Sequence, residues 1–222
     1  MEIKTKADAE KVLRGWQDLN EGPIATVKSL LNKNGYFEVP HFLLSYIDFL
    51  SGLASGKGRN SKSSDMRAYF KKYFPSAYVF PSAWLIYQFR NGLVHEFKPK
   101  VICMDNKEVG WHISLKPDEH HLKIRPSEKR ADFFNLHLSA PEFLEDFLVS
   151  VECFRQEIHS DDPESDDSAL KKFIKGYDAF SKPVNIDKIT SEPKEIKNTE
   201  VAPYVTNEDK TWLKNQIAAF NK

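Results

Sequence analysis

Residues 39–54 form the most apolar stretch of this chain, and they constrain its fold more than any other segment. The large apolar side chains of the stretch include Phe42, Leu43, Leu44, Tyr46, Ile47, Phe49 and Leu50. They occupy most of the circumference of a helix, which is typical of a helix that is surrounded by others. The stretch therefore predicts a helical bundle with this segment in its middle.

Helical spacing of apolar residues predicts further helices around this one. They cover approximately residues 12–19, 23–34, 64–74 and 81–95. Pro23 suits the first turn of its helix, and Ser64 is expected to cap the third of these segments. Pro75 should end that segment. The first hundred residues therefore read as a bundle.

The pattern changes to short alternating segments after residue 100. Three strands are expected, at 101–104, 111–115 and 120–124, and residues 133–138 could add a fourth. Ser139 and Pro141 then begin the clearest helix of the chain, with an apolar stripe from Phe143 to Ile158. The expected fold is mainly α: a helical bundle with a small antiparallel β-sheet inserted at about 100–138 and a C-terminal extension.

The chain is expected to divide into a bundle with its β insertion, residues 1–160, and an extension, residues 161–222. The extension begins with an acidic hinge at 161–167 and a short helix at 169–180. An extended linker is expected at 182–206, and Thr206 with Asp209 can form a capping box for a final amphipathic helix. That helix must bury its apolar face on its own bundle, on a second subunit or on a partner protein.

The net charge of the whole chain is zero, but one segment carries an excess of basic side chains. The 222 residues carry 32 Lys and Arg against 32 Asp and Glu, which excludes a wholly basic or wholly acidic protein. Residues 51–100, however, hold 9 basic and 2 acidic side chains, a net of +7. Such an excess attracts polyanions, unless the acidic second half of the chain balances it in three dimensions.

Several protein classes are excluded by simpler features. The first residues are charged and offer no apolar core of a signal peptide, and no run approaches the roughly 18 apolar residues that span a bilayer. We therefore expect a soluble, cytoplasmic protein without membrane contacts. The two cysteines, Cys103 and Cys153, are too few for a disulfide framework and are expected to be core or near-core thiols.

The most informative segment is Leu85–His95, which contains Arg90, Asn91 and His95. On a helix Asn91 and His95 project from one side, whereas Arg90 and His95 lie about 140° apart. One copy would not easily surround a small ligand, but two copies meeting across a two-fold axis could build a composite pocket. Gly92 would let another backbone approach closely at that seam.

This segment resembles the signature of the HEPN superfamily (higher eukaryotes and prokaryotes nucleotide-binding domains), in which Arg, a polar residue and His have this spacing near the end of a bundle helix. The resemblance covers about residues 8–160. It implies a homodimeric, metal-independent endoribonuclease, a hydrolase of toxin–antitoxin or other defence systems, with an antitoxin or another protein partner possible through the C-terminal helix. Other members of the superfamily are inactive and serve as RNA- or nucleotide-binding or protein-interaction modules.

The residues themselves suit RNA cleavage without a metal or another cofactor. RNA carries its own nucleophile, the 2′-hydroxyl, and His95 can move a proton at neutral pH. Arg90 can bind phosphate oxygens and stabilise the transition state, while Asn91 can orient the phosphate or the imidazole. Candidate RNA-binding residues are Lys57, Arg59, Lys62, Lys71, Lys72 and Tyr87.

Other interpretations of the same residues remain open. Arg90 can simply pair with an acidic neighbour, and His95 can bond to the last carbonyls of its helix. The cluster Asp118–His121 resembles a set of metal ligands, and His112 and His121 could share one face of the sheet. Neighbouring strand residues point to opposite faces, however, and no third ligand is placed, so no metal is expected.

Overall fold

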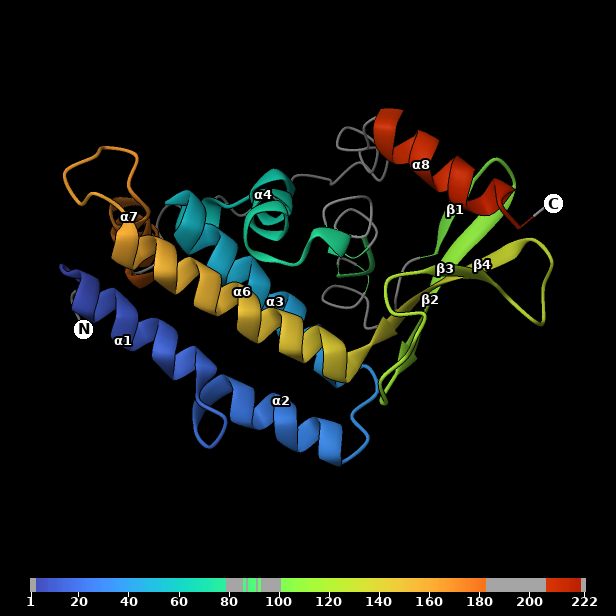
Figure 1. Cartoon of the computed structure of the whole chain (residues 1–222), viewed down its shortest axis with the longest axis horizontal. Helices are drawn as coiled ribbons and strands as arrows, with labels where there is room; N and C mark the ends of the chain where they lie inside the picture. The colour runs from blue at the N-terminus through green and yellow to red at the C-terminus, as the bar shows by residue number, and fades with distance from the viewer. Residues whose placement is uncertain are drawn as a thin grey trace, which may run out of the picture.

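The computed structural model describes residues 3–78, 86, 88–90, 92, 101–182 and 207–220. Its helices are α1 (Lys6–Gln17), α2 (Gly22–Asn32), α3 (Glu38–Ser55), α4 (Ser63–Tyr73), α6 (Ala140–Ser160), α7 (Ala169–Ser181) and α8 (Asn207–Ala218), with single 3₁₀ turns η1 (Gly58–Asn60) and η2 (Ser76–Tyr78). Its strands are β1 (Ile102–Met104), β2 (Lys107–Ser114), β3 (Ile124–Pro126) and β4 (Phe133–Ser139). The protein is mainly helical, with the sheet at one end of the bundle (Figure 1).

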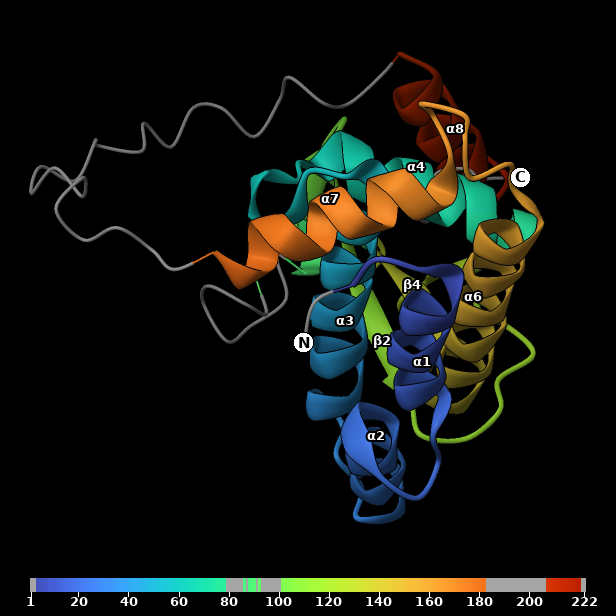
Figure 2. The ribbon, with the colours of Figure 1, turned by 90° about the vertical axis from the view of Figure 1, so that its left-hand side faces the viewer.

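α3 lies in the middle of the bundle, as its apolar pattern predicts. Helices α2, α4, α6 and α7 all pack against it, while α1 lies along α6 (Figure 2). The side chains of α3 that are completely buried are Val39, Leu43, Leu44, Ile47, Leu50 and Leu53. A helix with so much of its surface covered holds the surrounding helices in register, because each of them buries its apolar stripe on it.

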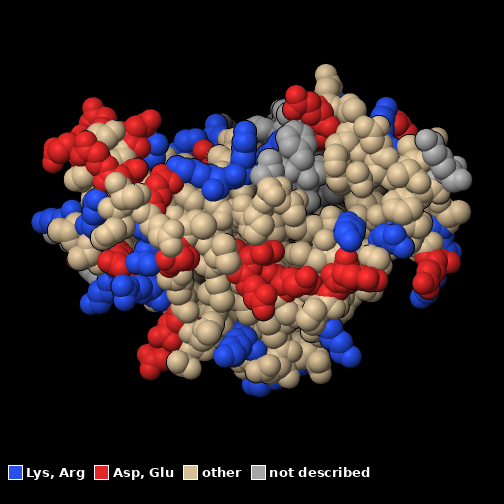
Figure 3. Space-filling view, viewed as in Figure 1, with Lys and Arg blue, Asp and Glu red and all other residues tan. Residues whose placement is uncertain are grey.

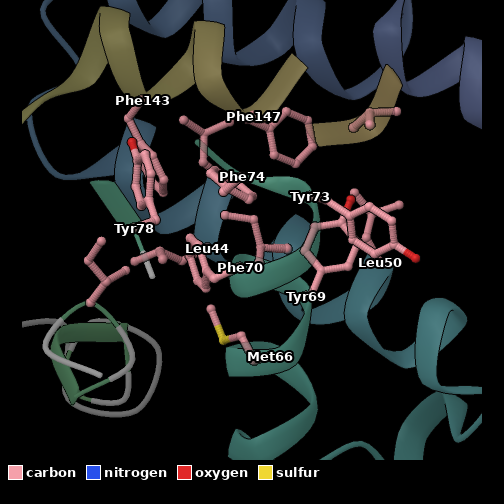
Figure 4. Close-up of a cluster of buried hydrophobic side chains, with 14 of the residues drawn as sticks. Leu44, Leu50, Met66, Tyr69, Phe70, Tyr73, Phe74, Tyr78, Phe143 and Phe147 are labelled. Atoms are coloured by element: carbon pink, nitrogen blue, oxygen red, sulfur yellow. The ribbon is translucent and has the colours of Figure 1, made fainter. Parts of the chain in front are cut away.

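Aromatic side chains fill the space between α3, α4 and α6 (Figure 4). Phe70 stacks on Tyr78 with ring centroids 5.6 Å apart, and Phe74 contacts Phe143 from α6 at 6.3 Å. Each buried ring of this size contributes about 1.5–3 kcal/mol relative to an exposed one. This cluster joins η2 and the first turns of α6, and therefore holds the bundle against the sheet.

The ends of the helices follow the expected chemistry, with one correction. Ser139 accepts from the backbone N–H of Glu142, and Gly56 ends α3 with a positive φ of 71°. Ser64, however, does not cap α4, which starts at Ser63. Asp65 takes the capping role from inside the first turn, since its carboxylate accepts the backbone N–H of Lys62 at 2.8 Å.

The sheet is mixed rather than antiparallel. Its order is β1-β2-β4-β3, and the central pair, β2 and β4, runs parallel, with His112 opposite His137. The antiparallel expectation was wrong because residues 115–132 form a connection long enough for a crossover, and this connection adds β3 to the far edge of β4.

The strand expected at 120–124 is also displaced. β3 begins only at Ile124, because residues 118–122 turn back on themselves. The Asp118 side chain accepts the backbone N–H of His120 at 2.9 Å, and Leu122 has a φ of 61°. Aspartate stabilises such a turn by bonding the backbone two residues on, which competes with strand formation.

α7 is held against α3 by a very close approach of two backbones. A Cβ at Gly176 would lie 2.7 Å from the carbonyl oxygen of Gly52, and a Cβ at Gly52 would lie 2.8 Å from the ring of Phe180. Only glycine fits at such contacts. Residues 169–181 thus pack as a helix of the bundle, and Figure 2 shows α7 crossing it above α3.

α8 buries its apolar face on this same chain, which answers a question that the sequence leaves open. Leu213 and Ile217 are buried, and Phe220 lies 6.3 Å from the ring of Phe134 in β4. The buried carboxylate of Asp209 pairs with Arg67 of α4 at 3.1 Å. The predicted capping residue Thr206 lies outside the described residues.

Both cysteines are exposed, contrary to the expectation of core thiols. Cys153 lies on α6 between Val151 and Phe154, which are buried, but projects from the outer side of the helix. Cys103 lies on β1, an edge strand of the sheet. Across the described ranges, no helix is both long enough and apolar enough to cross a bilayer.

Candidate functional site

Of the predicted catalytic residues, the structure describes Arg90. Asn91 and His95 lie outside the described residues, as does Tyr87. Ile86, Gln88, Phe89, Arg90 and Gly92 are helical, in agreement with a helix in this region. Of the three residues predicted for the composite site, Arg90 is therefore the one whose contacts the structure describes.

The neighbours of Arg90 are buried and fix the direction in which its side chain extends. Ile86 and Phe89 are completely buried, and the ring of Phe89 stacks on Trp111 of β2 with centroids 4.5 Å apart. Arg90, one residue further, is turned by about 100° around the helix. It reaches α3, where its Nη2 atom lies 2.5 Å from Oδ2 of Asp48.

Asp48 connects Arg90 to a polar pocket. The pocket has a volume of about 330 Å³ and is lined by Ser45, Asp48, Phe49, Gly58, Arg59, Ser61 and Phe180. Arg59 donates from Nη2 to the carbonyl oxygen of Phe180 at 2.7 Å. A carboxylate that accepts from one arginine thus lines the same pocket as a second arginine.

The contact between Arg90 and Asp48 agrees with one of the two interpretations of Arg90, namely pairing with an acidic neighbour. The side chain of Arg90 is 16% exposed and that of Asp48 is 32% exposed, so the pair lies at the edge of the solvent. A charge-assisted bond in this setting orients the guanidinium. Arg90 itself does not line the pocket, so an anion that enters it would first meet Asp48 and Arg59.

The other predicted RNA-binding residues are distributed rather than aligned. Lys57 pairs with Asp65 at 2.6 Å and Lys72 with Glu157 at 2.5 Å, so the charges of both are partly compensated. Lys62 precedes α4, and Lys71 is exposed in its last turn. Of the five described candidates, Arg59 is the one that lines the pocket beside Asp48.

Charge is unevenly distributed on the surface. Figure 3 shows basic side chains gathered over α4 and a row of acidic ones across the middle of the same face. The basic excess of residues 51–100 is therefore partly visible as a surface feature over α4. The acidic row shows that the second half of the chain also contributes to this face.

The histidines of the sheet do not form the metal site that was considered for them. Within the described ranges, no group of three or more His, Cys, Asp or Glu side chains is arranged to hold a metal ion. Nδ1 of His121 accepts the backbone N–H of Ser139 at 3.0 Å, and its Nε2 lies 3.0 Å from the hydroxyl of Tyr78. His112 instead lies beside His137, with ring centroids 4.7 Å apart.

Asp48 is the site residue that the sequence interpretation missed. A signal for it exists, because Asp48 is the only Asp, Glu, Lys or Arg between Glu38 and Lys57. A lone acid in the most apolar helix of a bundle is expected to have a partner, since a charge that is partly removed from water is costly when unpaired. The arginine of the motif was an available partner, although its distance in sequence concealed the pairing.

Comparisons with protein-family models, with curated proteins and with solved structures find no match to this chain. What can be said of its function therefore comes from its own residues and their contacts. The contact between Arg90 and Asp48, beside a pocket that Arg59 also lines, is the feature that bears most directly on the predicted chemistry.

Proposed function

We propose that this chain is a metal-independent endoribonuclease of the HEPN type, acting as a homodimer and serving as a toxin or defence effector. The observation that carries the proposal is the position of Arg90, which reaches a carboxylate lining a polar pocket together with a second arginine. The motif residues Asn91 and His95 follow it in sequence at the spacing of the superfamily signature.

Arg90 binds the scissile phosphate in this proposal. Its guanidinium can donate two parallel bonds to non-bridging oxygens, and it stabilises the negative charge that builds up as the phosphorus becomes pentacoordinate. Asp48 keeps the guanidinium extended in the absence of RNA. The phosphate then shares or replaces this bond.

His95 moves the protons. As a base it takes the proton of the 2′-hydroxyl, whose oxygen then attacks the adjacent phosphorus. The bond from phosphorus to the 5′-oxygen breaks, and that oxygen receives a proton from an acid, either the same imidazole or its counterpart in the second copy. The products carry a 2′,3′-cyclic phosphate and a 5′-hydroxyl. Asn91 holds the phosphate or the imidazole in position.

A second candidate is a binding module of the same bundle without nuclease activity. The observation in its favour is that Arg90, Lys57 and Lys72 each contact a carboxylate. Such contacts suit a surface that holds RNA or a nucleotide by exchange of ion pairs and leaves it uncut. This candidate predicts salt-sensitive RNA binding without products.

The deciding experiment incubates the purified full-length protein with a mixed RNA pool in EDTA. Wild type should cleave, and His95→Ala and Arg90→Ala should each lower the rate at least 100-fold, on the scale typical for general acid–base groups and oxyanion donors. His159→Ala and Arg14→Ala are matched controls, because both side chains are exposed, and should cleave like wild type.

Product ends and oligomeric state complete the test. Cleavage that leaves a 2′,3′-cyclic phosphate, requires both motif residues and sediments with a dimer supports the proposal. Intact RNA that is nevertheless retained at low salt would replace the nuclease by the binding module. Cleavage that survives His95→Ala would overturn the assigned chemistry.

A further inference from the structure

The outer face of the sheet holds a second pocket, and Arg90, the described residue of the motif, does not line it. Its volume is about 660 Å³, and it is lined by His112, His120, Arg125, Pro126, Ser127, Glu128, Lys129, Asn135 and His137. Pockets of about 300–1,000 Å³ are the usual size for small-molecule and cofactor sites. This histidine pocket is twice the volume of the one beside Asp48.

The strand register explains why these residues meet. His112 of β2 is opposite His137 of β4, and Asn135 of β4 is opposite Arg125 of β3. Facing residues on neighbouring strands share one side of a sheet, and strands lie about 4.8 Å apart. The alternate residues Ile113, Leu136 and Leu138 are buried, so the polar set faces away from the bundle.

His137 is held in a fixed orientation at the centre of this set. Its Nδ1 atom lies 3.0 Å from Oδ2 of Asp118, whose other oxygen accepts the backbone N–H of His120. The carboxylate therefore favours the Nδ1–H tautomer and leaves Nε2 for a ligand. Burial lowers the pKa of His137, and His112 and His120 lower it too, while Asp118 acts in the opposite direction.

The connection between β2 and β3, which contains Asp118 and His120, is held to the bundle by a chain of hydrogen bonds through His121. Because Ser139 donates to Nδ1 of His121, the Nε2 of this ring carries the proton and donates to the hydroxyl of Tyr78, at 3.0 Å. Tyr78 in turn donates to Asp146 of α6, also at 3.0 Å. The wall of the pocket is thus fixed to the bundle core before any ligand arrives.

The permanent charges of the pocket favour an anion. Arg125 and Lys129 are exposed and, within the part of the chain that the structure describes, neither makes an ion pair. Glu128 is the acid that lines the pocket with them. Arg125 and Lys129 against Glu128 leave one positive charge in excess among the residues that line the pocket, while the carboxylate of Asp118 is engaged by His137, so the lining suits an anion such as a phosphate.

Two further observations, a contact of Arg125 and an unpartnered atom of His120, also favour a binding site here. The guanidinium of Arg125 lies 5.6 Å from the ring centroid of Phe220 at the end of α8, a cation–π contact that restrains it. Nδ1 of His120 is buried and has no hydrogen-bond partner among the described residues. A buried polar atom left unsatisfied costs stability, and a bound ligand that supplies the missing partner is one explanation for it.

We propose that the histidine pocket binds the phosphate group of a phosphomonoester of mononucleotide size. The phosphate lies between the two histidines, His112 and His137, and the two cations, Arg125 and Lys129. Asn135 offers an amide to the same ligand. Arg90 is not among the residues that line this pocket, and the proposal does not rest on Arg90 or His95.

Calorimetric titration of the full-length protein tests the proposal. The probes are inorganic phosphate, 5′-AMP, 3′-AMP and adenosine, together with an eight-nucleotide RNA bearing either a 3′-phosphate or a 3′-hydroxyl. Binding of phosphate and at least one AMP below 1 mM, with none of adenosine, is expected. The RNA pair then shows whether the phosphate belongs to a free nucleotide or to an RNA end.

Variants locate the binding. Arg125→Gln and His137→Gln should each weaken AMP binding about tenfold, the loss expected for a charge-assisted bond. Arg130→Gln is the matched control, because Arg130 lies in the same connection but already pairs with Asp132 and Glu108. Arg125 is exposed, so its variant should fold even if His137→Gln does not.

Equal binding of adenosine, no binding of any phosphate at 5 mM, or affinity unchanged by Arg125→Gln would each overturn the proposal. Arg90→Ala and His95→Ala should bind AMP as wild type does. A nuclease test that fails while this titration succeeds, or the reverse, would therefore separate the two proposals.

Discussion

Arg90 and Asp48 form an ion pair that ties the helical segment around Phe89 to α3. Asp48 lies on the most apolar helix of the bundle, and Arg90 belongs to the motif for which we propose nuclease chemistry. The pair is only partly covered, so an incoming phosphate can compete with the carboxylate for the guanidinium. This competition has a measurable consequence.

Replacing Asp48 by asparagine should tighten RNA binding. The substitution removes a negative charge from the pocket and frees a donor, which favours a phosphate by about 0.5–1 kcal/mol, or about two- to fivefold in Kd. Fluorescence anisotropy with a labelled 12-nucleotide RNA measures this in a His95→Ala background, where the RNA stays intact. Glu21→Gln, an exposed acid on the N-cap of α2, matches the change in net charge. Equal affinities of the two variants would show that Arg90 does not meet the phosphate.

Gly176→Ala should destabilise the protein by about 1–3 kcal/mol, the usual cost of overpacking. The new methyl would lie 2.7 Å from the carbonyl oxygen of Gly52 and 2.8 Å from Cα of Leu53, so α7 must move away from α3. Gly15→Ala in α1 is the control, because nothing lies within 4 Å of its Cβ, and it should stabilise by about 0.5–1 kcal/mol. Urea unfolding followed by circular dichroism measures both. A neutral Gly176→Ala would mean that the helices are not in this contact.

The helices around α3 and the contact between α7 and α3 show which features of the fold the sequence could predict and which it could not. The helices around α3 follow from apolar spacing, because periodicity is a local property of the chain. The contact of Gly176 with Gly52 joins segments that are far apart in the sequence, and no pattern in either segment predicts that they pack together. The direction of the β2–β4 pair was missed for the same reason: strand length and alternation do not reveal which edge a crossover reaches.

In the candidate sites, likewise, single residues could be identified from the sequence but their partners could not. Arg90 was identified from a short motif, but its partner Asp48 lies 42 residues earlier and needed the fold to be recognised. His112 was noted with His121, yet the parallel register places it beside His137. A slip of one residue in register turns every side chain of a strand to the other face, so a set such as His112, Asn135 and His137 requires the structure.

Glu152→Gln should lower stability at neutral pH but not in strong acid. Hydrogen bonds from Arg155 outweigh burial, and with those from Gln17 and Gln156 they lower the pKa of Glu152 to about 2. The unfolded chain therefore binds more protons than the folded one between pH 4.5 and 2, so the contribution of Glu152 is complete above pH 4.5 and is lost as pH falls to 2. Urea unfolding at pH 6, 4 and 2.5 should show the gap between wild type and variant closing.

Glu145→Gln removes an exposed carboxylate from the same helix and controls for the change in net charge. Arg155 also binds Glu10 of α1 at 2.6 Å, so the Glu152 network fastens α1 to α6. A gap between wild type and Glu152→Gln that stays constant from pH 6 to 2.5 would contradict the low pKa.

Asp209→Ala should release α8 while leaving the rest of the bundle folded. Asp209 is completely buried and pairs with Arg67, and removing one partner of a buried pair costs about 3 kcal/mol. Hydrogen exchange should therefore become at least tenfold faster for the amides of residues 207–218 and stay unchanged in α6. Glu208→Ala removes the exposed neighbour and should leave α8 protected. Undiminished protection of α8 in Asp209→Ala would show that the pair of Asp209 and Arg67 does not hold this helix. Because Phe220 restrains Arg125, the Asp209→Ala variant should also bind AMP more weakly.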